Sequence, residues 1–380
     1  MSEPGIEGPY PLRGLDTLWS APKGARATAM VTGAAQRVVL PPMPIGEAML
    51  RRMALPPTDL PVAWDEAEYQ SHIPWVCRFE GVEVHGDGGI VLADGVIVAD
   101  TLAQCVPGRQ GLAETPQGPV LLRDGPARAL PGAWLSLLCG NHWNHYHWLM
   151  DGIGRLAAAT DEVWAGIAGV LVPEALTPVA AEALAATGLA ERFTLLPVAP
   201  DDRLVPEVFV VPWTMAGGFW PHPALPRFLA GLLPEAAHST VFPRRFYVDR
   251  GGSGNRRLEN EAAVIAALAR QGVMPVRLER LTFATQVALF RHAELVVAPH
   301  GAGLANLVFA PPGCAVVELV MDAYPHWAFR RLAALGGLDY DCVIGRSPPA
   351  PPGTWLHGRG WSVPETYVRA AVAAALERLG

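Results

Sequence analysis

The stretch VVAPHGAG (residues 296–303) places a histidine between a strand-like run and two glycines, a pattern suited to holding an anion. Its β-branched valines favour a buried strand, which a proline then ends because it offers no N–H. Beyond His300, Gly301 and Gly303 let the backbone approach a ligand. A short helix predicted at 304–310 would point its free N–H groups at a negative charge. The stretch therefore predicts a phosphate site at a strand end.

Two further strand ends carry charges that suit the same ligand. The run RRFYVDR ends in Arg250, and Arg256 follows the glycine-rich loop GGSGN. Guanidinium forks hold phosphates well, and Glu318 on a later strand is placed to accept hydrogen bonds from a ribose or sugar diol. Singly, each could have a purely structural role: a tight turn, a surface arginine, a buried ion-pair partner. Because strand ends meet at one edge of an open α/β sheet, together they predict a nucleoside-diphosphate site.

A second cluster, NHWNHYHWLMDGIGRL, combines histidines with an aspartate. If the segment is helical from residue 144, Asn144, His147, Asp151 and Arg155 share one face. His147 and Asp151 are then four residues apart and can hydrogen-bond, which orients the imidazole and raises its basicity. The pattern predicts a general acid/base pair, with Asp151 as the base and His147 positioning it. The reverse assignment is the alternative.

Three alternative roles stay open. His145, His147 and Asp151 could ligate zinc or iron in a metal-dependent hydrolase, although a helical register turns His145 away from His147. The cluster could also be a polar helix start with a capping histidine. The third is a protein that binds a nucleotide sugar without turning it over.

Composition narrows the function classes. Of 380 residues, 51% are hydrophobic and 17% are charged, and the net charge is −7. This charge excludes a broad positively charged surface that binds nucleic acid, so any anion-binding site must be local. Lys23 is the only lysine, which argues against Schiff-base chemistry and leaves arginine to hold phosphates. The five cysteines show no CxxC pairing and indicate free thiols.

The elements that must position these residues form two series along the chain. Residues 72–138 alternate short β-type runs with Asp-Gly and Gly-Gly turns, which are typical of hairpins. From residue 141 onward helix-type and strand-type segments alternate, and a second series begins after a break at about 234–243. The pattern predicts an α/β protein with two Rossmann-like domains facing across a cleft and a strand-rich N-terminal part.

Changes in pattern also give domain boundaries and a location. They predict an irregular N-terminal lead-in at 1–62, an N-terminal domain at 63–235, a C-terminal nucleotide-binding Rossmann-like domain at 241–362 and a C-terminal helix packing back on the body at 363–380. No charged-then-apolar leader opens the sequence, and no clean apolar run reaches the roughly 18 residues of a membrane span. We therefore expect a cytoplasmic protein and leave peripheral membrane association open; the sequence does not indicate an oligomeric state.

The motifs together resemble glycosyltransferase family 61 over about residues 141–320. Four motifs occur in family order: N-x-x-H-W-x-x-D at Asn144, His147, Trp148 and Asp151; an arginine pair with N-E at Arg250, Arg256, Asn260 and Glu261; F-x-x-Q-x-x-L-F from Phe283 to Phe290; and HGAGLxNxxF from His300 to Phe309, followed by Glu318-Leu319. Residues 1–130 carry nothing that this resemblance assigns.

The resemblance implies an inverting glycosyltransferase of the GT-B type that uses a nucleotide-sugar donor, usually a uridine diphosphate sugar, without metal or other cofactor. It implies a glycan or other hydroxyl acceptor, and by analogy a cytoplasmic bacterial form that acts in capsule or exopolysaccharide assembly. Asn144, His147 and Asp151 would then lie on the acceptor side. The implied donor-binding residues are Arg250, Arg256, Asn260, His300, Gly301, Ala302, Gly303, Asn306 and Glu318.

Overall fold

The chain forms two compact units. The structure, a computed structural model, describes residues 6–7, 12–13, 24–53, 64–103, 105–106, 108–109, 112–116, 118–122, 126–213, 220–233, 242–251, 254–349, 351 and 354–380. The N-terminal unit consists of residues 1–35 and 72–217, and the C-terminal unit consists of residues 36–71 and 218–380. The predicted break at about 234–243 lies almost entirely outside the described residues.

A five-stranded parallel sheet forms the centre of the C-terminal unit, in the order β17-β16-β18-β19-β20. Its strands are β16 (Arg245–Val248), β17 (Met274–Val276), β18 (Leu295–Pro299), β19 (Ala315–Met321) and β20 (Asp339–Gly345). The central strands are almost wholly buried, as continuous apolar runs predict for a parallel sheet covered on both faces. In chain order the sheet runs 2-1-3-4-5, so the strand order reverses between β16 and β18.

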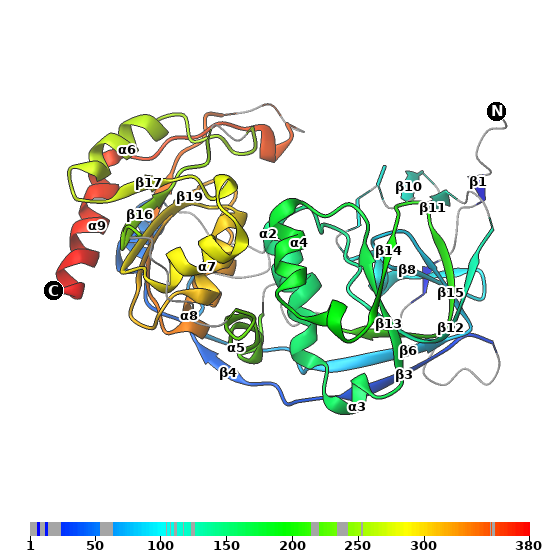
Figure 1. Ribbon diagram of the computed structural model, residues 1–380. Coiled ribbons are helices and arrows are strands. Elements are labelled where there is room, and N and C mark those ends of the chain that lie inside the picture. Colours follow the sequence, from blue (N-terminus) through cyan, green and yellow to red (C-terminus); the bar gives the residue numbers. More distant parts are fainter. Residues whose placement is uncertain are drawn as a thin grey trace. The chain divides into compact units, whose positions relative to one another are not determined.

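Helices cover both faces of this sheet (Figure 1). One face carries α6 (Glu261–Ala269) and α9 (Glu365–Leu379), and the other carries α5 (Ala224–Ala230), α7 (Phe283–Arg291) and α8 (Ala328–Gly336). A buried apolar core fills the space between α6, α9 and the sheet. The α/β alternation predicted for residues 244–321 is thereby confirmed, and α8 and β20 extend it further.

Part of the predicted irregular lead-in is ordered and belongs to the C-terminal unit. It forms β4 (Arg37–Val39) and α1 (Pro44–Arg52), and β4 pairs with β5 (Glu68–Gln70). The Asp341 carboxylate accepts hydrogen bonds from the N–H groups of Ile45 and Gly46, at 3.1 and 3.0 Å. Hydrogen bonds from a residue nearly 300 positions away in the sequence thus hold the start of α1, which is why local periodicity does not predict this helix.

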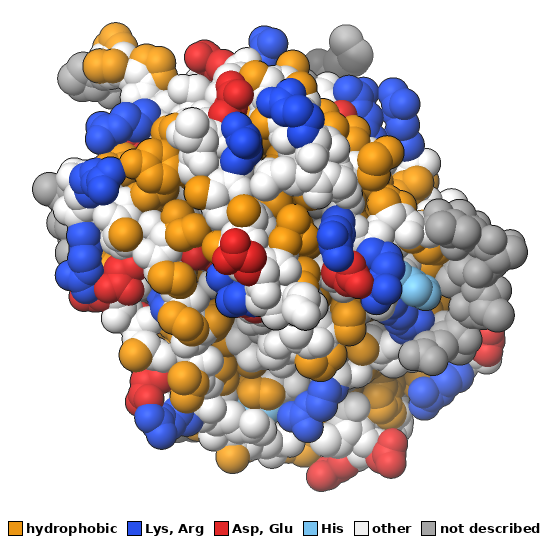
Figure 2. Space-filling view, turned by 90° about the vertical axis from the view of Figure 1, so that its left-hand side faces the viewer, with side chains coloured by type: hydrophobic (Ala, Val, Ile, Leu, Met, Phe, Trp, Pro, Cys, Tyr) orange, Lys and Arg blue, Asp and Glu red, His pale blue; other side chains and the backbone are white. Residues whose placement is uncertain are grey.

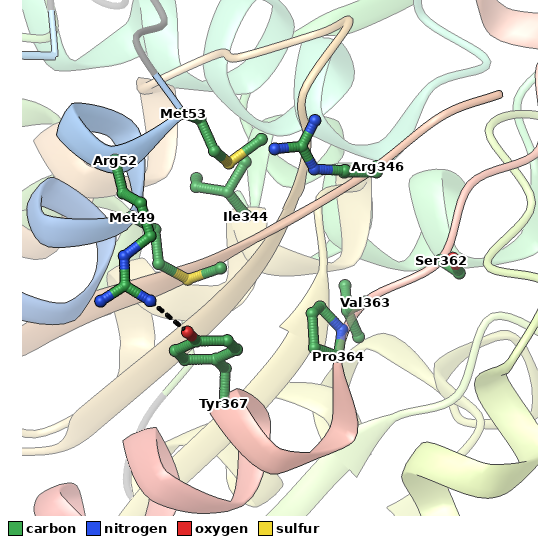
Figure 3. A pocket seen from close by; sticks show the side chains of 9 residues that line it. All are labelled: Met49, Arg52, Met53, Ile344, Arg346, Ser362, Val363, Pro364 and Tyr367. Atoms are coloured by element: carbon green, nitrogen blue, oxygen red, sulfur yellow. Dashed lines mark hydrogen bonds between the residues drawn. The ribbon is translucent and has the colours of Figure 1, made fainter. Parts of the chain in front are cut away.

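The first and last helices of the C-terminal unit are joined at a surface hollow of about 390 Å³ (Figure 3). Arg52 on α1 donates a hydrogen bond to the Tyr367 hydroxyl on α9 at 2.7 Å. Met49 on α1 and Met53, the residue directly after α1, line the hollow together with Ile344 near the end of β20. The bond therefore fixes a segment from the start of the chain against the C-terminal helix of the same unit.

The N-terminal unit is built on a mixed sheet. Strand β12 (Arg128–Ser136) lies between β13 (Ile167–Pro173) and β15 (Arg203–Pro212), parallel to both, and β14 (Thr194–Val198) extends the parallel part. The predicted hairpin region joins the same sheet through β15, which pairs antiparallel with β6 and β7. From that region come β6 (Trp75–Glu80), β7 (Val82–His85), β8 (Ile90–Ala93) and β9 (Val96–Val98), whereas β2 (Leu12–Arg13) and β3 (Arg26–Val31) belong to the segment predicted as an irregular lead-in. A separate small sheet contains β1 (Ile6–Glu7), β10 (Leu112–Thr115) and β11 (Gly118–Leu122).

The surface mixes charged and apolar side chains. The face drawn in Figure 2 intersperses basic, acidic and hydrophobic side chains. Most of the large hydrophobic side chains of the described residues are buried, and Trp355 is the largest of those left exposed, at 65%. None of the helices in the described ranges has both the length and the apolar character needed to cross a bilayer.

Candidate functional site

The reversal of strand order in the C-terminal unit brings two predicted residues together. Tyr247 on β16 pairs with Val297 on β18, and three residues further along each strand lie Arg250 and His300. The Arg250 Nη1 donates to the His300 carbonyl oxygen at 3.4 Å. A crevice outside the carboxyl ends of the strands at such a reversal is where open α/β sheets bind ligands. The sequence-based juxtaposition of Arg250 and His300 is therefore present in the fold.

Glu318 lies in the protein interior, whereas the sequence suggested a position in contact with the ligand. It is an interior residue of β19, paired with Ala298, and is fully buried. Its Oε1 lies 2.5 Å from His300 Nδ1, and its Oε2 accepts the Tyr340 hydroxyl at 2.7 Å. A ribose or sugar diol cannot reach a carboxylate whose two oxygens are already bonded in the core. Glu318 instead orients the His300 ring, and the expectation of direct sugar contact is corrected.

Burial decides where the protons of this chain of hydrogen bonds sit. Desolvation raises the pKa of Glu318 to about 8 and, with nearby Arg256 and Arg250, lowers the pKa of His300 well below its usual value. Below pH 8 the carboxyl group is therefore neutral. Because Oε2 accepts from Tyr340, the carboxyl proton lies on Oε1 and is donated to His300 Nδ1. The neutral imidazole then carries its own proton on Nε2, which makes no hydrogen bond within the described residues.

The shared proton predicts a loss of stability between about pH 6.5 and pH 8. In this window the folded pair keeps one proton, whereas in the unfolded chain both groups, with ordinary pKa values near 4.3 and 6.5, have lost theirs. Since the native state binds more protons, the free energy of unfolding falls as the pH rises, by about 2 kcal/mol in total. Glu318→Gln keeps both hydrogen bonds without a titrating proton. Urea unfolding at pH 6.5 and at pH 8 should show the fall in the free energy of unfolding in the wild type only. Equal falls in the wild type and in Glu318→Gln would contradict the proton shared by Glu318 and His300.

Basic and aromatic side chains surround His300. The Arg256 guanidinium lies 4.7 Å above the Tyr324 ring and donates to His357 Nδ1. The His300 ring lies 5.6 Å from the Tyr324 ring and 5.4 Å from the His326 ring. We call this group the basic cluster: Arg250, Arg256, His300, His326 and His357, gathered around Tyr324.

The basic cluster brings two desolvated guanidinium groups together. Burial lowers the pKa of Arg250, and the neighbouring Arg256 lowers it further. Burial also lowers the pKa of Arg256, whose Nε is buried without a hydrogen bond, and Arg256 forms no ion pair with any described carboxylate. Burial lowers the pKa of His357, and the positive charge of Arg256 lowers it further by a smaller amount. Two desolvated like charges destabilise each other, and an anion bound between them would relieve that cost.

Two residues predicted to bind the ligand have structural partners instead. The Asn260 side chain donates to the Val363 carbonyl at 2.8 Å and accepts from the Val363 N–H at 3.2 Å, so it joins the start of α6 to the segment before α9. Asn306 is fully buried and donates to Gln286 Oε1 at 2.8 Å. Short amide side chains satisfy buried backbone and side-chain groups as readily as ligands, and the sequence does not distinguish these roles.

The glycine turn after His300 is closely packed. A 3₁₀-helix (η8) spans Ala302–Phe309, where a short helix at 304–310 was predicted. A Cβ at Gly301 would lie 3.5 Å from Arg250 Nε, which is ordinary contact. A Cβ at Gly303 would lie 2.9 Å from Leu278 Cδ1. Gly301 thus leaves room beside the guanidinium, and Gly303 allows η8 to approach its neighbours.

Gly303→Ala is expected to lower the free energy of unfolding by about 1 kcal/mol, because the added methyl overpacks against the terminal Cδ1 of Leu278, which must move aside. Gly254→Ala is the matched control: its added methyl meets nothing within 4 Å. Urea unfolding of both variants measures the difference. Equal stabilities would show that Leu278 gives way freely.

In the N-terminal unit, the segment after β12 holds the second predicted group. A single turn, α2 (His145–His147), runs into a π-helical turn, η3 (Trp148–Gly152). His147 Nδ1 lies 2.8 Å from Asp151 Oδ2, as the four-residue spacing predicted. The His147 side chain is 20% exposed and that of Asp151 only 4%. Asn144 Oδ1 caps the turn by accepting the Tyr146 N–H at 3.0 Å.

Trp148 and Gly152 fix the π-helical turn that carries this pair. The Trp148 ring is fully buried, and its Nε1 donates to the Ala180 carbonyl at 2.9 Å in α4 (Pro178–Ala185). A Cβ at Gly152 would lie 2.6 Å from that ring. The wide turn therefore depends on this tryptophan and glycine, and π-helical turns are often found at functional sites.

Two further observations bear on this unit. His142 Nε2 lies 3.5 Å from Asp87 Oδ2, and both side chains are almost fully buried, so they form a second histidine–aspartate pair inside the unit. Within the described residues, no three histidine, cysteine, aspartate or glutamate side chains come together as a metal site would require. The His145, His147 and Asp151 ligand set of the hydrolase alternative is therefore not assembled.

Two members of the basic cluster, His326 and His357, and the central Tyr324 were not predicted from the sequence. Tyr324 and His326 follow β19 in the run MDAYPH, and a signal was present there, because they come directly after a predicted strand. His357 lies 101 residues from the arginine that it contacts. No local pattern indicates such a partner.

Comparison with known proteins points to one enzyme class. Residues 145–317 match the family described as Glycosyltransferase 61. Over 99 residues the chain is 39% identical to the human protein O-linked-mannose beta-1,4-N-acetylglucosaminyltransferase 2, covering 24% of this chain and 17% of that one. The proteins of the same name from Takifugu rubripes and Tetraodon nigroviridis are 38% identical over 120 residues and 36% over 101. These matches cover 30% and 25% of this chain and 19% and 17% of those proteins. Over residues 145–317 the chain is thus similar to glycosyltransferase family 61, and it spans less than a fifth of the length of these relatives.

Proposed function

We propose that the protein is an inverting glycosyltransferase that transfers a sugar from a uridine diphosphate donor to a hydroxyl acceptor without a metal ion. One observation carries the proposal: two partly buried arginines lie side by side in the basic cluster, at the reversal of strand order where such sheets bind ligands. A diphosphate supplies negative charge to both Arg250 and Arg256. The relatives' names support N-acetylglucosamine as the sugar.

In the proposed reaction the C-terminal unit holds the donor. The acceptor oxygen attacks the anomeric carbon, the bond from that carbon to the diphosphate oxygen breaks, and the diphosphate leaves with the electron pair. Arg250 and Arg256 neutralise the charge that develops on it, a task that a divalent cation performs in other enzymes. The His300 Nε2–H donates to a phosphate oxygen while Glu318 keeps that proton in place. Loss of the Glu318 proton above about pH 8 should therefore weaken diphosphate binding.

The N-terminal unit supplies the base. Of the two candidates, His147 has the more exposed side chain, at 20%, whereas the Asp151 carboxylate is buried against His147 Nδ1. We therefore assign His147 as the group that takes the acceptor proton, at Nε2, with Asp151 fixing its tautomer and stabilising the imidazolium. This is the alternative assignment from the sequence, and exposure favours it.

Calorimetric titration tests the donor site. The wild-type protein should bind uridine diphosphate more tightly than the diphosphates of guanosine, cytidine or thymidine, and binding should survive a chelator. Transfer of the sugar to an acceptor, followed by NMR of the anomeric proton, then tests turnover and inversion. Binding of no nucleoside diphosphate would overturn the proposal, and binding that a chelator abolishes would overturn its metal independence. Tight binding without any transfer would favour the non-catalytic alternative.

A further inference from the structure

An exposed indole lies at the edge of the basic cluster. Trp355 precedes the short 3₁₀ turn η9 (Leu356–Gly358), and 65% of its surface is open to solvent. A Cβ at Gly358 would lie 3.1 Å from the indole Cε3, so the ring packs against its own turn on one side. Water contact over so much of a tryptophan surface is unfavourable, and such side chains are commonly covered by a partner or ligand.

One side chain, His357, lies between the indole and Arg256. The indole ring centroid lies 5.6 Å from that of His357, which accepts a hydrogen bond from Arg256. His357 in turn contacts the Tyr324 ring at 5.2 Å. A ligand whose phosphates lie on Arg256 therefore has its neighbouring group within reach of Trp355.

We propose that Trp355 stacks on the base of the nucleoside diphosphate, a role that rests on the proposed donor site. A uracil ring is planar with two apolar faces, and stacking on an aromatic side chain requires no hydrogen-bond partners. A sugar would require acceptors for its hydroxyl groups. Of the side-chain rings described in the structure, only His357 contacts Trp355. The surroundings thus suit a base better than a sugar.

Comparison of two ligands tests this role. Uridine diphosphate carries the base, whereas inorganic pyrophosphate occupies the arginines alone. Trp355→Ala should weaken uridine diphosphate binding roughly 10-fold and leave the pyrophosphate dissociation constant unchanged. Trp355→Phe should keep most of the affinity. Met274→Ala is the matched control, because Met274 is also an exposed apolar side chain of this unit, at 55%, and it should change neither constant.

Three outcomes would overturn the inference. An unchanged affinity for uridine diphosphate in Trp355→Ala would exclude base stacking. If a uridine diphosphate sugar is titrated as a third ligand and it alone binds more weakly to Trp355→Ala, the indole holds the sugar. Equal losses for uridine diphosphate and pyrophosphate would mean that Trp355 acts by positioning His357. If the wild type binds neither ligand, the donor site itself fails, so the two proposals are tested separately.

Discussion

Replacing His147 by glutamine is expected to lower kcat by about 10²–10⁴-fold, the usual value of general-base assistance. The side-chain amide can still hydrogen-bond to Asp151, but it takes no proton from an acceptor hydroxyl. The dissociation constant for uridine diphosphate should not change, because the residues of the basic cluster all belong to the C-terminal unit. Steady-state kinetics combined with calorimetry separates the two effects.

His145→Gln is the matched control for this variant. It alters the neighbouring histidine of the same turn, and the metal-hydrolase alternative requires that side chain whereas the proposed base does not. Asp151→Asn should also lower kcat, because the amide can donate to His147 Nδ1 and so leave the proton on Nε2. Full transfer activity in His147→Gln would refute the assignment of the base. An equal loss of kcat in His145→Gln would favour the metal-hydrolase alternative.

The sequence predicts best where the chemistry is local. Val296 and Val297 lie in a continuous apolar run, which a buried parallel strand requires, and the structure contains that strand. The four-residue spacing of His147 and Asp151 fixes their contact through helix geometry alone. Even there, the π-helical turn depends on the packing of Trp148 against α4, which no periodicity indicates.

Predictions fail where a polar side chain has two possible partners. Glu318, Asn260 and Asn306 are of types that bind sugars and nucleotides, yet in the structure each bonds to other groups of the protein. Their neighbours come from segments up to 103 residues away. A motif fixes the residue types but not which of them reach the ligand, because supporting residues and ligand-binding residues are under the same chemical constraints.

Arg250→Met is expected to impair function much more than stability. Arg250 is partly buried beside Arg256, and both burial and that neighbouring charge lower its pKa. Removing the guanidinium should lower kcat by about 10²–10³-fold, because the leaving diphosphate loses one of its two neutralising groups. The affinity for uridine diphosphate should fall as well.

The same substitution should change the free energy of unfolding little, because it removes the repulsion from Arg256 together with the attraction to Glu261 and the hydrogen bond to the His300 carbonyl. Arg250→Lys keeps the charge but not the bidentate fork, so its kcat should lie between those of the wild type and Arg250→Met. Kinetics, calorimetry and urea unfolding measure the three quantities on the same preparations. If binding and stability fall together, Arg250 holds the strand end together and the anion site lies elsewhere. If binding falls while stability holds, the positive charge at this strand end serves the ligand, because the fold is no weaker without it.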